Sequence, residues 1–223
     1  MTASGTYAYA PANSDLLTLA YRRAGVKRAE LSAEHIADGV AEMRMQAVDW
    51  ANRNPNRWLL ETQTVALVAG TATYNVNARI VETAVVYYND GYRDRVMGSL
   101  SASEYGAIAN KTTQSAPTSY WFNLALTPTI TLWPVPAAAY TLSIQSFRQM
   151  QDMNAANGET PDMPYRFYDA FVTGLAGRLA EIYNPAKADR LNAQHEMKFK
   201  LAAAMDQEQV PLSIIPGLDQ YTR

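Results

Sequence analysis

The spacing of apolar residues changes its period twice along the chain, and this change restricts the possible folds more than any other feature. Apolar residues recur every three or four positions over residues 14–53 and again over residues 164–208, as on the buried face of a helix. Between them, residues 58–148 alternate apolar and polar positions, as half-buried strands do. This order predicts an α+β fold in which N- and C-terminal helices form a helical bundle, with a central antiparallel β region.

Capping residues indicate where the N-terminal helices begin and end. Asn13 or Ser14 is a favourable N-cap for a first helix, and Gly25 can end that helix in a left-handed conformation. Ser32 can cap a second, longer helix that ends near Asn54-Pro55. The buried stripe expected on the longer helix consists of Ile36, Val40, Met43, Ala47 and Trp50.

The C-terminal helical region is expected to contain two helices. Pro164 suits the first position of one helix, and Asn184 can cap another that reaches about Gln209. The small residues Gly174 and Gly177 allow a neighbouring helix to approach closely, so they are interpreted as core packing. The buried stripe expected on the first of these helices consists of Tyr168, Phe171, Leu175, Leu179 and Ile182.

Turn residues divide the β region into strands. Alternation around Val65 and Leu67 resumes at Tyr74 and Val76 after Gly70, which predicts a hairpin. A second hairpin is predicted over residues 81–97, because Asn, Asp and Gly readily adopt the turn conformations that a tight hairpin needs. The residues expected at its tip are Tyr88, Asn89, Asp90, Gly91 and Tyr92.

The second half of the β region contains a small helix and further strands. Ser101 and Glu104 have the spacing of a capping box, which predicts a helix over residues 101–110. Alternation then predicts strands, and Pro134 and Pro136 are expected to force a turn because proline cannot donate a backbone hydrogen bond. The predicted strands lie at residues 119–126, 129–133 and 140–147.

The last residues differ in character from the rest of the chain. Residues 209–223 combine prolines with apolar side chains and lack a folding pattern of their own. We expect them to form an extended C-terminal arm that could reach roughly 50 Å and bind a partner. Its candidate contact residues are Pro211, Leu212, Ile214, Ile215, Pro216, Leu218 and Tyr221. The main domain is expected over residues 1–208, with helices at 14–24, 32–53 and 164–208 and a β insertion at 58–148.

Composition and motifs give no indication of catalysis. The chain has no cysteine, which excludes disulfides, a thiolate nucleophile and cysteine metal sites. Its two histidines, His35 and His195, lack the second ligand that a recognisable zinc site would place one helical turn away. There is no nucleotide-binding glycine motif and no nucleophile elbow. We therefore expect no cofactor, no metal and no enzyme activity.

Charge and hydropathy restrict the partners. A net charge of -2 argues against a protein that wraps nucleic acid with a strongly basic face. The sequence also lacks an export signal and an apolar run of about 20 residues, so we expect neither export nor a membrane partner. Contact with phosphate or with an acidic partner remains a hypothesis for the densest basic cluster, against the plainer interpretation of solvated cations at a helix end. The cluster consists of Arg22, Arg23, Lys27 and Arg28.

Several short segments, in order, resemble the head-to-tail adaptors of tailed bacteriophages, which are also described as tail accessory or DNA-stabilisation proteins. The similarity extends over about residues 14–208. It is carried by Trp58-Leu-Leu, Tyr74-Asn-Val, Glu104-Tyr105, Pro117-Thr-Ser-Tyr120, Leu132-Trp-Pro-Val-Pro136 with Tyr140-Thr-Leu-Ser-Ile144, and Gly174-Leu-Ala-Gly-Arg-Leu-Ala180 with Asp189-Arg190.

This resemblance implies a structural role in the virion neck, between capsid and tail, after assembly in the host cytoplasm. Such adaptors form a ring, usually of twelve copies. The helical part docks under the portal protein and the C-terminal arm lies along it, while the β loops face a tail or nozzle protein. Genomic DNA passes through the lumen without sequence-specific contact.

Two other functions remain open at this stage. The chain could be another neck or tail-completion protein. It could also be a virion-associated peptidoglycan hydrolase, in which two carboxylates such as Glu61 and Glu82 would act as acid and base.

Overall fold

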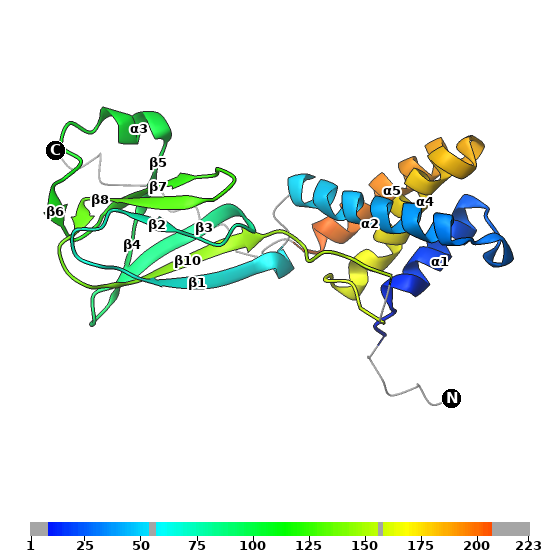
Figure 1. The fold of residues 1–223 in the computed structure, drawn as a ribbon, viewed down its shortest axis with the longest axis horizontal. Coiled ribbons are helices and arrows are strands. Elements are labelled where there is room, and N and C mark those ends of the chain that lie inside the picture. Colours follow the sequence, from blue (N-terminus) through cyan, green and yellow to red (C-terminus); the bar gives the residue numbers. More distant parts are fainter. Residues whose placement is uncertain (1–8, 54–56, 156–157, 207–223) are drawn as a thin grey trace, which may run out of the picture.

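The computed structural model describes residues 9–53, 57–155 and 158–206 and shows two lobes joined end to end (Figure 1). The β lobe, residues 60–148, contains β1 to β10 and the short helix α3 (Ala102–Ala107). The predicted α+β class is confirmed. The helical lobe contains α1 (Asn13–Ala24), α2 (Ala33–Arg53), α4 (Tyr168–Tyr183) and α5 (Pro185–Ala204), with 3-10 turns η1 (Arg28–Glu30), η2 (Arg57–Leu59) and η3 (Tyr165–Phe167).

The helical lobe is built around α4, which contacts α1, α2 and α5. Nearly every residue of α4 between Ala170 and Ala180 is buried, so this helix has no single buried stripe. Trp50 of α2 lies at the centre of the core and contacts Phe171 of α4 and Phe199 of α5. A helix that is apolar on all sides is expected in the interior of a lobe.

Most residues of the predicted stripes are covered, but each stripe contains one residue that is exposed. Met43, Ala47 and Trp50 are buried as expected, whereas Ile36 is 37% exposed and Ile182 is 52% exposed. Both exposed residues lie in a terminal turn of their helix. Periodicity alone does not show where a neighbouring element stops covering a helix.

Two of the predicted helix caps, at Gly25 and Ser32, are confirmed. Gly25 ends α1 with a φ of 105°, and the Ser32 hydroxyl accepts a hydrogen bond from the His35 backbone amide at 3.4 Å. The predicted cap at Asn13 or Ser14 is wrong, because α1 begins at Asn13 and its N-cap is Ala12. Asn184 does occupy the N-cap position of α5, as predicted, but its side chain makes no capping hydrogen bond. Asn13 donates to the Asn154 carbonyl at 3.0 Å, and Asn184 donates to the Ala24 carbonyl at the end of α1, also at 3.0 Å.

Other helix limits differ from the sequence predictions at the C-terminal side. Pro164 precedes the 3-10 turn η3, and α4 begins only at Tyr168. Helix α5 ends at Ala204, and the predicted extension to Gln209 lies outside the described residues.

The predicted close approach of two helices at glycine is confirmed between α4 and α5. A Cβ atom on Gly174 would lie 2.6 Å from the His195 Nδ1 atom, and one on Gly177 would lie 2.0 Å from the Asn192 Oδ1 atom. Real Cβ atoms do not approach neighbours so closely, so only glycine lets the side chains of α5 lie against α4.

The β lobe consists of two four-stranded sheets that share one hydrophobic core and a short two-stranded pair. The first sheet is antiparallel, in the order β1 (Leu60–Ala66), β10 (Thr141–Arg148), β3 (Ile80–Asn89) and β4 (Asp94–Val96). The second has the order β2 (Thr73–Asn75), β8 (Thr129–Trp133), β7 (Ser119–Asn123) and β5 (Gly98–Leu100). Parallel pairing occurs between β5 and β7, and between β6 (Gln114–Ser115) and β9 (Val135–Pro136).

The first predicted hairpin is wrong, because β1 and β2 belong to different sheets. Val65 of β1 pairs with Leu142, and Tyr74 of β2 pairs with Ile130. Gly70 does lie in a turn, with a φ of 82°. The chain crosses from one sheet to the other there, so both segments find partners from the second half of the β region.

The local predictions in the rest of the β lobe are largely confirmed. Strands β3 and β4 form the second hairpin, and Ser101 and Glu104 form the capping box of α3, which ends earlier than expected, at Ala107. Strands β7 and β8 pair as neighbours, although β7 ends at Asn123. The Pro134 and Pro136 segment does not simply turn, because Val135 and Pro136 form β9.

Candidate interaction surfaces

The tip of the β3–β4 hairpin is held by its own side chains. Asp90 accepts hydrogen bonds at 3.0 Å from the backbone amides of Tyr92 and Arg93, and its other oxygen lies 2.8 Å from Arg95 Nε. The side-chain oxygen of Asn89 accepts a hydrogen bond from the Gly91 backbone amide at 2.7 Å. The hydrogen bond from Arg95 and the two amides lower the pKa of Asp90 to about 2. The loop is therefore preorganised although it is exposed.

The five predicted hairpin residues divide into two groups. Tyr88 is buried in the β core and packs against Tyr140 with ring centroids 5.0 Å apart. Tyr92 is 97% exposed, and Asn89, Asp90 and Gly91 form the turn beside it. A partner at this end of the β lobe would contact Tyr92 and the turn, because the Tyr88 side chain serves the core.

The four predicted basic residues do not form one free patch. Arg23 makes an ion pair with Asp169 at 2.7 Å and bonds to Thr173, so it ties α1 to α4. Burial raises the pKa of Asp169, but hydrogen bonds from Lys198 and Arg23 outweigh this and lower it overall. Lys27 lies 3.9 Å from Glu30. Of these four residues, only Arg22 and Arg28 are exposed and make no ion pair with another described residue.

The predicted contact residues of the C-terminal arm, residues 211–221, lie outside the described residues.

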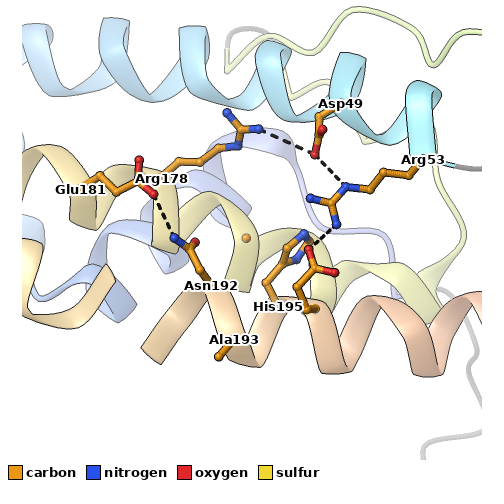
Figure 2. A pocket seen from close by; sticks show the side chains of 9 residues that line it. Asp49, Arg53, Arg178, Glu181, Asn192, Ala193 and His195 are labelled. Atoms are coloured by element: carbon orange, nitrogen blue, oxygen red, sulfur yellow. Dashed lines mark hydrogen bonds and ion pairs between the residues drawn. The ribbon is translucent and has the colours of Figure 1, made fainter. Parts of the chain in front are cut away.

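A cavity of about 540 Å³ lies between α2, α4 and α5 (Figure 2). An ion-pair chain crosses it: Arg53 bonds to Asp49 at 2.9 Å and to Glu196, while Arg178 reaches Asp49 at 3.7 Å. The hydrogen bond from Arg53 lowers the pKa of Glu196. The lining residues are Asp49, Arg53, Gly174, Arg178, Glu181, Asn192, Ala193, His195 and Glu196.

The groups in this cavity are engaged with one another. Its carboxylates bond to arginine, and Glu181 accepts a hydrogen bond from Asn192 at 2.9 Å. His195 is buried, with Nδ1 2.9 Å from the Ala170 carbonyl and its ring parallel to Trp50 at 6.1 Å. Among the described residues, no cluster of His, Asp or Glu could hold a metal ion. The polar side chains that line the cavity therefore bond α2, α4 and α5 to one another.

Burial of His195 predicts a stability change with pH. Burial lowers its pKa below the ordinary value of 6.5. The unfolded chain therefore binds a proton near pH 6.5 that the folded chain does not bind, so the free energy of unfolding should fall as the pH is lowered through this value. Urea unfolding between pH 7.5 and 5 measures the slope. His195→Gln, which can still donate to Ala170, should flatten it, and an unchanged slope in this variant would contradict the assignment.

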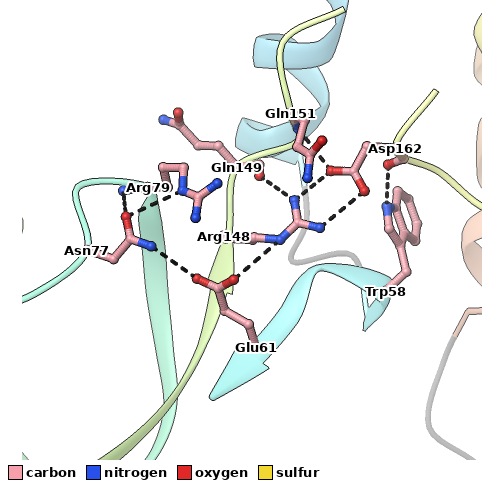
Figure 3. A network of polar contacts seen from close by, with 8 residues as sticks. All are labelled: Trp58, Glu61, Asn77, Arg79, Arg148, Gln149, Gln151 and Asp162. Carbon is pink, nitrogen blue, oxygen red and sulfur yellow. Dashed lines mark hydrogen bonds and ion pairs between the residues drawn. The ribbon is translucent and has the colours of Figure 1, made fainter. Parts of the chain in front are cut away.

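A second polar network lies where the two lobes meet (Figure 3). Arg148 at the end of β10 makes two hydrogen bonds to the Asp162 carboxylate, at 2.6 and 3.1 Å, and lies 3.5 Å from Glu61 of β1. The Trp58 indole donates to the Asp162 carbonyl at 3.1 Å. We call Trp58, Glu61, Arg148 and Asp162 the junction network. It ties together both segments that connect the lobes.

The junction network was not predicted from the sequence. Arg148 and Asp162 lie in segments without a motif, and only their proximity in the fold reveals them. From the sequence, Glu61 is a candidate only as one of a pair of carboxylates with Glu82. It bonds to Arg148 and accepts from Asn77 at 3.4 Å, whereas Glu82 is exposed on β3, on the other side of β10.

The comparison with known families identifies the class of protein. The family described as SU10 adaptor protein, a family of phage head-to-tail adaptors, matches residues 11–214. The chain belongs to this family. The match covers both lobes, so the resemblance to head-to-tail adaptors is confirmed. Among curated proteins, none matches this sequence.

Family membership makes the chain a phage structural adaptor and a virion component, and it implies interaction with phage portal or tail proteins. In the part of the chain that the structure describes, no helix is both long enough and apolar enough to cross a membrane.

Proposed function

We propose that this protein is the head-to-tail connector adaptor of a tailed phage, forming a dodecameric ring in the virion neck. The ring binds the portal protein, provides the platform to which a tail or nozzle protein attaches, and surrounds a channel for genomic DNA. Assembly takes place in the host cytoplasm. The observation that carries this proposal is the family match over residues 11–214, which includes both lobes.

The shape of the molecule supports a bridging role. The helical and β lobes lie end to end, so each copy presents two separated ends to different partners (Figure 1). The β3–β4 hairpin projects from the β lobe on the side away from the helices, with Tyr92 exposed at its tip. We assign the helical lobe and the C-terminal arm to the portal, and the hairpin to the tail component.

The charge of the chain supports passage of DNA without tight binding. Its net charge is -2, and affinity for the phosphate backbone comes mainly from lysine and arginine. We therefore propose contact with DNA that is weak and independent of sequence.

We also propose that the role is structural and not catalytic. Of the two carboxylates considered for glycan hydrolysis, Glu61 is engaged by Arg148 and Asn77. In the cavity of the helical lobe, arginine pairs with Asp49 and Glu196. A carboxylic acid catalyst needs a raised pKa, whereas the hydrogen bond from Arg53 lowers the pKa of Glu196.

Measuring the mass of the purified protein, alone and mixed with its portal, tests the proposal. Light scattering together with electron microscopy should show a complex that contains about twelve added copies in a ring on the portal. Attachment to a different ring of the neck would show a tail-completion role instead. A protein that stays monomeric and never binds the portal would contradict the adaptor assignment.

Deletion of residues 210–223 tests the role of the C-terminal arm. The truncated protein should keep its circular dichroism spectrum and melting temperature. It should no longer assemble on the portal, because an apolar segment of this kind provides contact area for a partner. Ile214→Asp combined with Ile215→Asp should have the same effect. Asp219→Ala combined with Gln220→Ala is the matched control. Full assembly of the shortened protein would show that the arm is not required.

A further inference from the structure

The side of α2 that faces away from the core carries an apolar stripe of its own. Met45 is 59% exposed and Val48 is 53% exposed, and both lie opposite the buried residues Met43 and Trp50 on this helix. Ala37 and Ala41 continue the stripe at helical spacing and are also exposed. We call Ala37, Ala41, Met45 and Val48 the α2 outer face.

Helix α5 carries a second apolar stripe. Met197, Leu201 and Met205 are 73%, 71% and 74% exposed, with a spacing of four residues. Ala193 is exposed one turn earlier. We call Ala193, Met197, Leu201 and Met205 the α5 outer face. Such exposed apolar stripes mark sites of interaction.

The two outer faces point in opposite directions. Trp50 and Phe199 lie on the inner sides of α2 and α5, and their ring centroids are 5.0 Å apart. Because each outer face lies on the other side of its own helix, the faces are on opposite sides of the lobe. At a rise of about 1.5 Å per residue, the α2 outer face (residues 37–48) and the α5 outer face (residues 193–205) are each about 17–18 Å long.

The charges beside the two faces are complementary. Glu34 is exposed beside the α2 outer face, whereas Arg190 and Lys200 are exposed beside the α5 outer face. Asp38 and Glu42 also lie beside the α2 outer face, but Asp38 accepts a hydrogen bond from the Tyr183 hydroxyl and Glu42 lies 3.5 Å from Arg178. Arg44 and Asp189, at the margins, are the exceptions. Neither Arg190 nor Lys200 has an ion-pair partner among the described residues. Two copies of the same face would bring like charges together, while one of each would join opposite charges.

We propose that the α2 outer face of one copy packs against the α5 outer face of a second copy of this chain. Such a contact uses a different surface on each partner and repeats from copy to copy, so it builds a ring or an open chain. Burying both apolar stripes removes them from water and satisfies the unpaired cations. The proposal deepens the proposed adaptor function, because it names the lateral contact within the ring.

The natural absence of cysteine allows a direct test by cross-linking. Met45→Cys and Leu201→Cys are prepared as two single variants, alone and bound to the portal, and treated with a short bismaleimide. Neither variant alone should give a cross-linked dimer. An equal mixture should give a dimer, and the double variant should give a ladder of larger products. Both positions are exposed, so each variant should keep the wild-type melting temperature.

A cysteine far from both outer faces is the matched control for the cross-linking experiment. Val96→Cys, which is 73% exposed on β4, should give no product when mixed with Leu201→Cys. A dimer of Met45→Cys with itself, or a product with the control, would overturn the proposal. Cross-linking of Leu201→Cys to Ile214→Cys within one chain, with none in the mixture, would show that the C-terminal arm covers α5 instead.

The same experiment separates the two proposals. If the portal binds but the mixture gives no cross-linked dimer, the lateral contact is wrong and the adaptor function stands. If the mixture cross-links in the free protein but the portal does not bind, the contact stands and the adaptor function is wrong. Absence of the mixed product in both samples overturns the lateral contact.

Discussion

Trp50→Ala should lower the free energy of unfolding by about 3–5 kcal/mol, the cost typical of removing a large buried aromatic side chain. Trp50 is fully buried at the centre of the helical lobe. Its ring packs edge to face on Phe171 at 5.4 Å and lies 5.0 Å from Phe199. Removing it leaves a cavity between α2, α4 and α5 that these helices cannot fill without moving.

Urea unfolding followed by circular dichroism measures this loss, since the variant retains all other helix-forming residues. Trp121→Ala is a suitable control, because Trp121 is partly exposed in the β lobe, where it stacks on Tyr105 at 5.2 Å. The control should lose far less stability. A loss below about 1 kcal/mol for Trp50→Ala, well under the typical range, would mean that Trp50 does not organise the core.

Arg148→Met should lower the free energy of unfolding by about 2–4 kcal/mol, since it leaves two partly buried carboxylates without their cation. The side chains of Arg148 and Asp162 are only 15% and 21% exposed, and Glu61 is 30% exposed. Hydrogen bonds to Asp162 raise the pKa of Arg148, which therefore stays charged. Methionine keeps an unbranched stem as long as that of Arg148 up to Nε and removes the guanidinium group, so the loss reports mainly on charge and hydrogen bonding.

A double-mutant cycle with Asp162→Asn isolates the pair. The two single changes should together cost clearly more than the double variant, because the Asp162 carboxylate is no longer left charged without Arg148 and only Glu61 loses its cation. Arg95→Met is the control, since its ion pair with Asp90 is in the exposed hairpin, and its effect should be small. Additive single effects would show that Arg148 and Asp162 act independently.

Several features of this protein could be predicted from the sequence because their causes lie within a few residues. The β3–β4 hairpin follows from Asn89, Asp90 and Gly91, whose side chains and conformations make the turn locally. The capping box of Ser101 and Glu104 is equally local. The α+β class follows from the period of apolar residues, which reflects the geometry of each element by itself.

Strand partners depended on the tertiary structure. Residues of β1 pair with β10, which lies about 80 positions later in the sequence. Alternation identifies a strand, but any other strand with a matching apolar side could pair with it. Asn184 shows the same limit, since its amide serves the end of α1 and not its own helix.

The exposed face of α2 and the junction network also depended on the tertiary structure. The spacing of apolar residues in α2 predicts one buried stripe, and it does not indicate that Met45 and Val48 lie on a second, exposed one. The junction network joins Arg148 to Asp162 and Glu61 through connections that exist only after both lobes have folded. By itself, the sequence determined the elements, the local turns and the resemblance to adaptors, because these depend on neighbouring residues. Only the tertiary structure decided which faces are covered and which charges meet, because both depend on residues far apart in the chain.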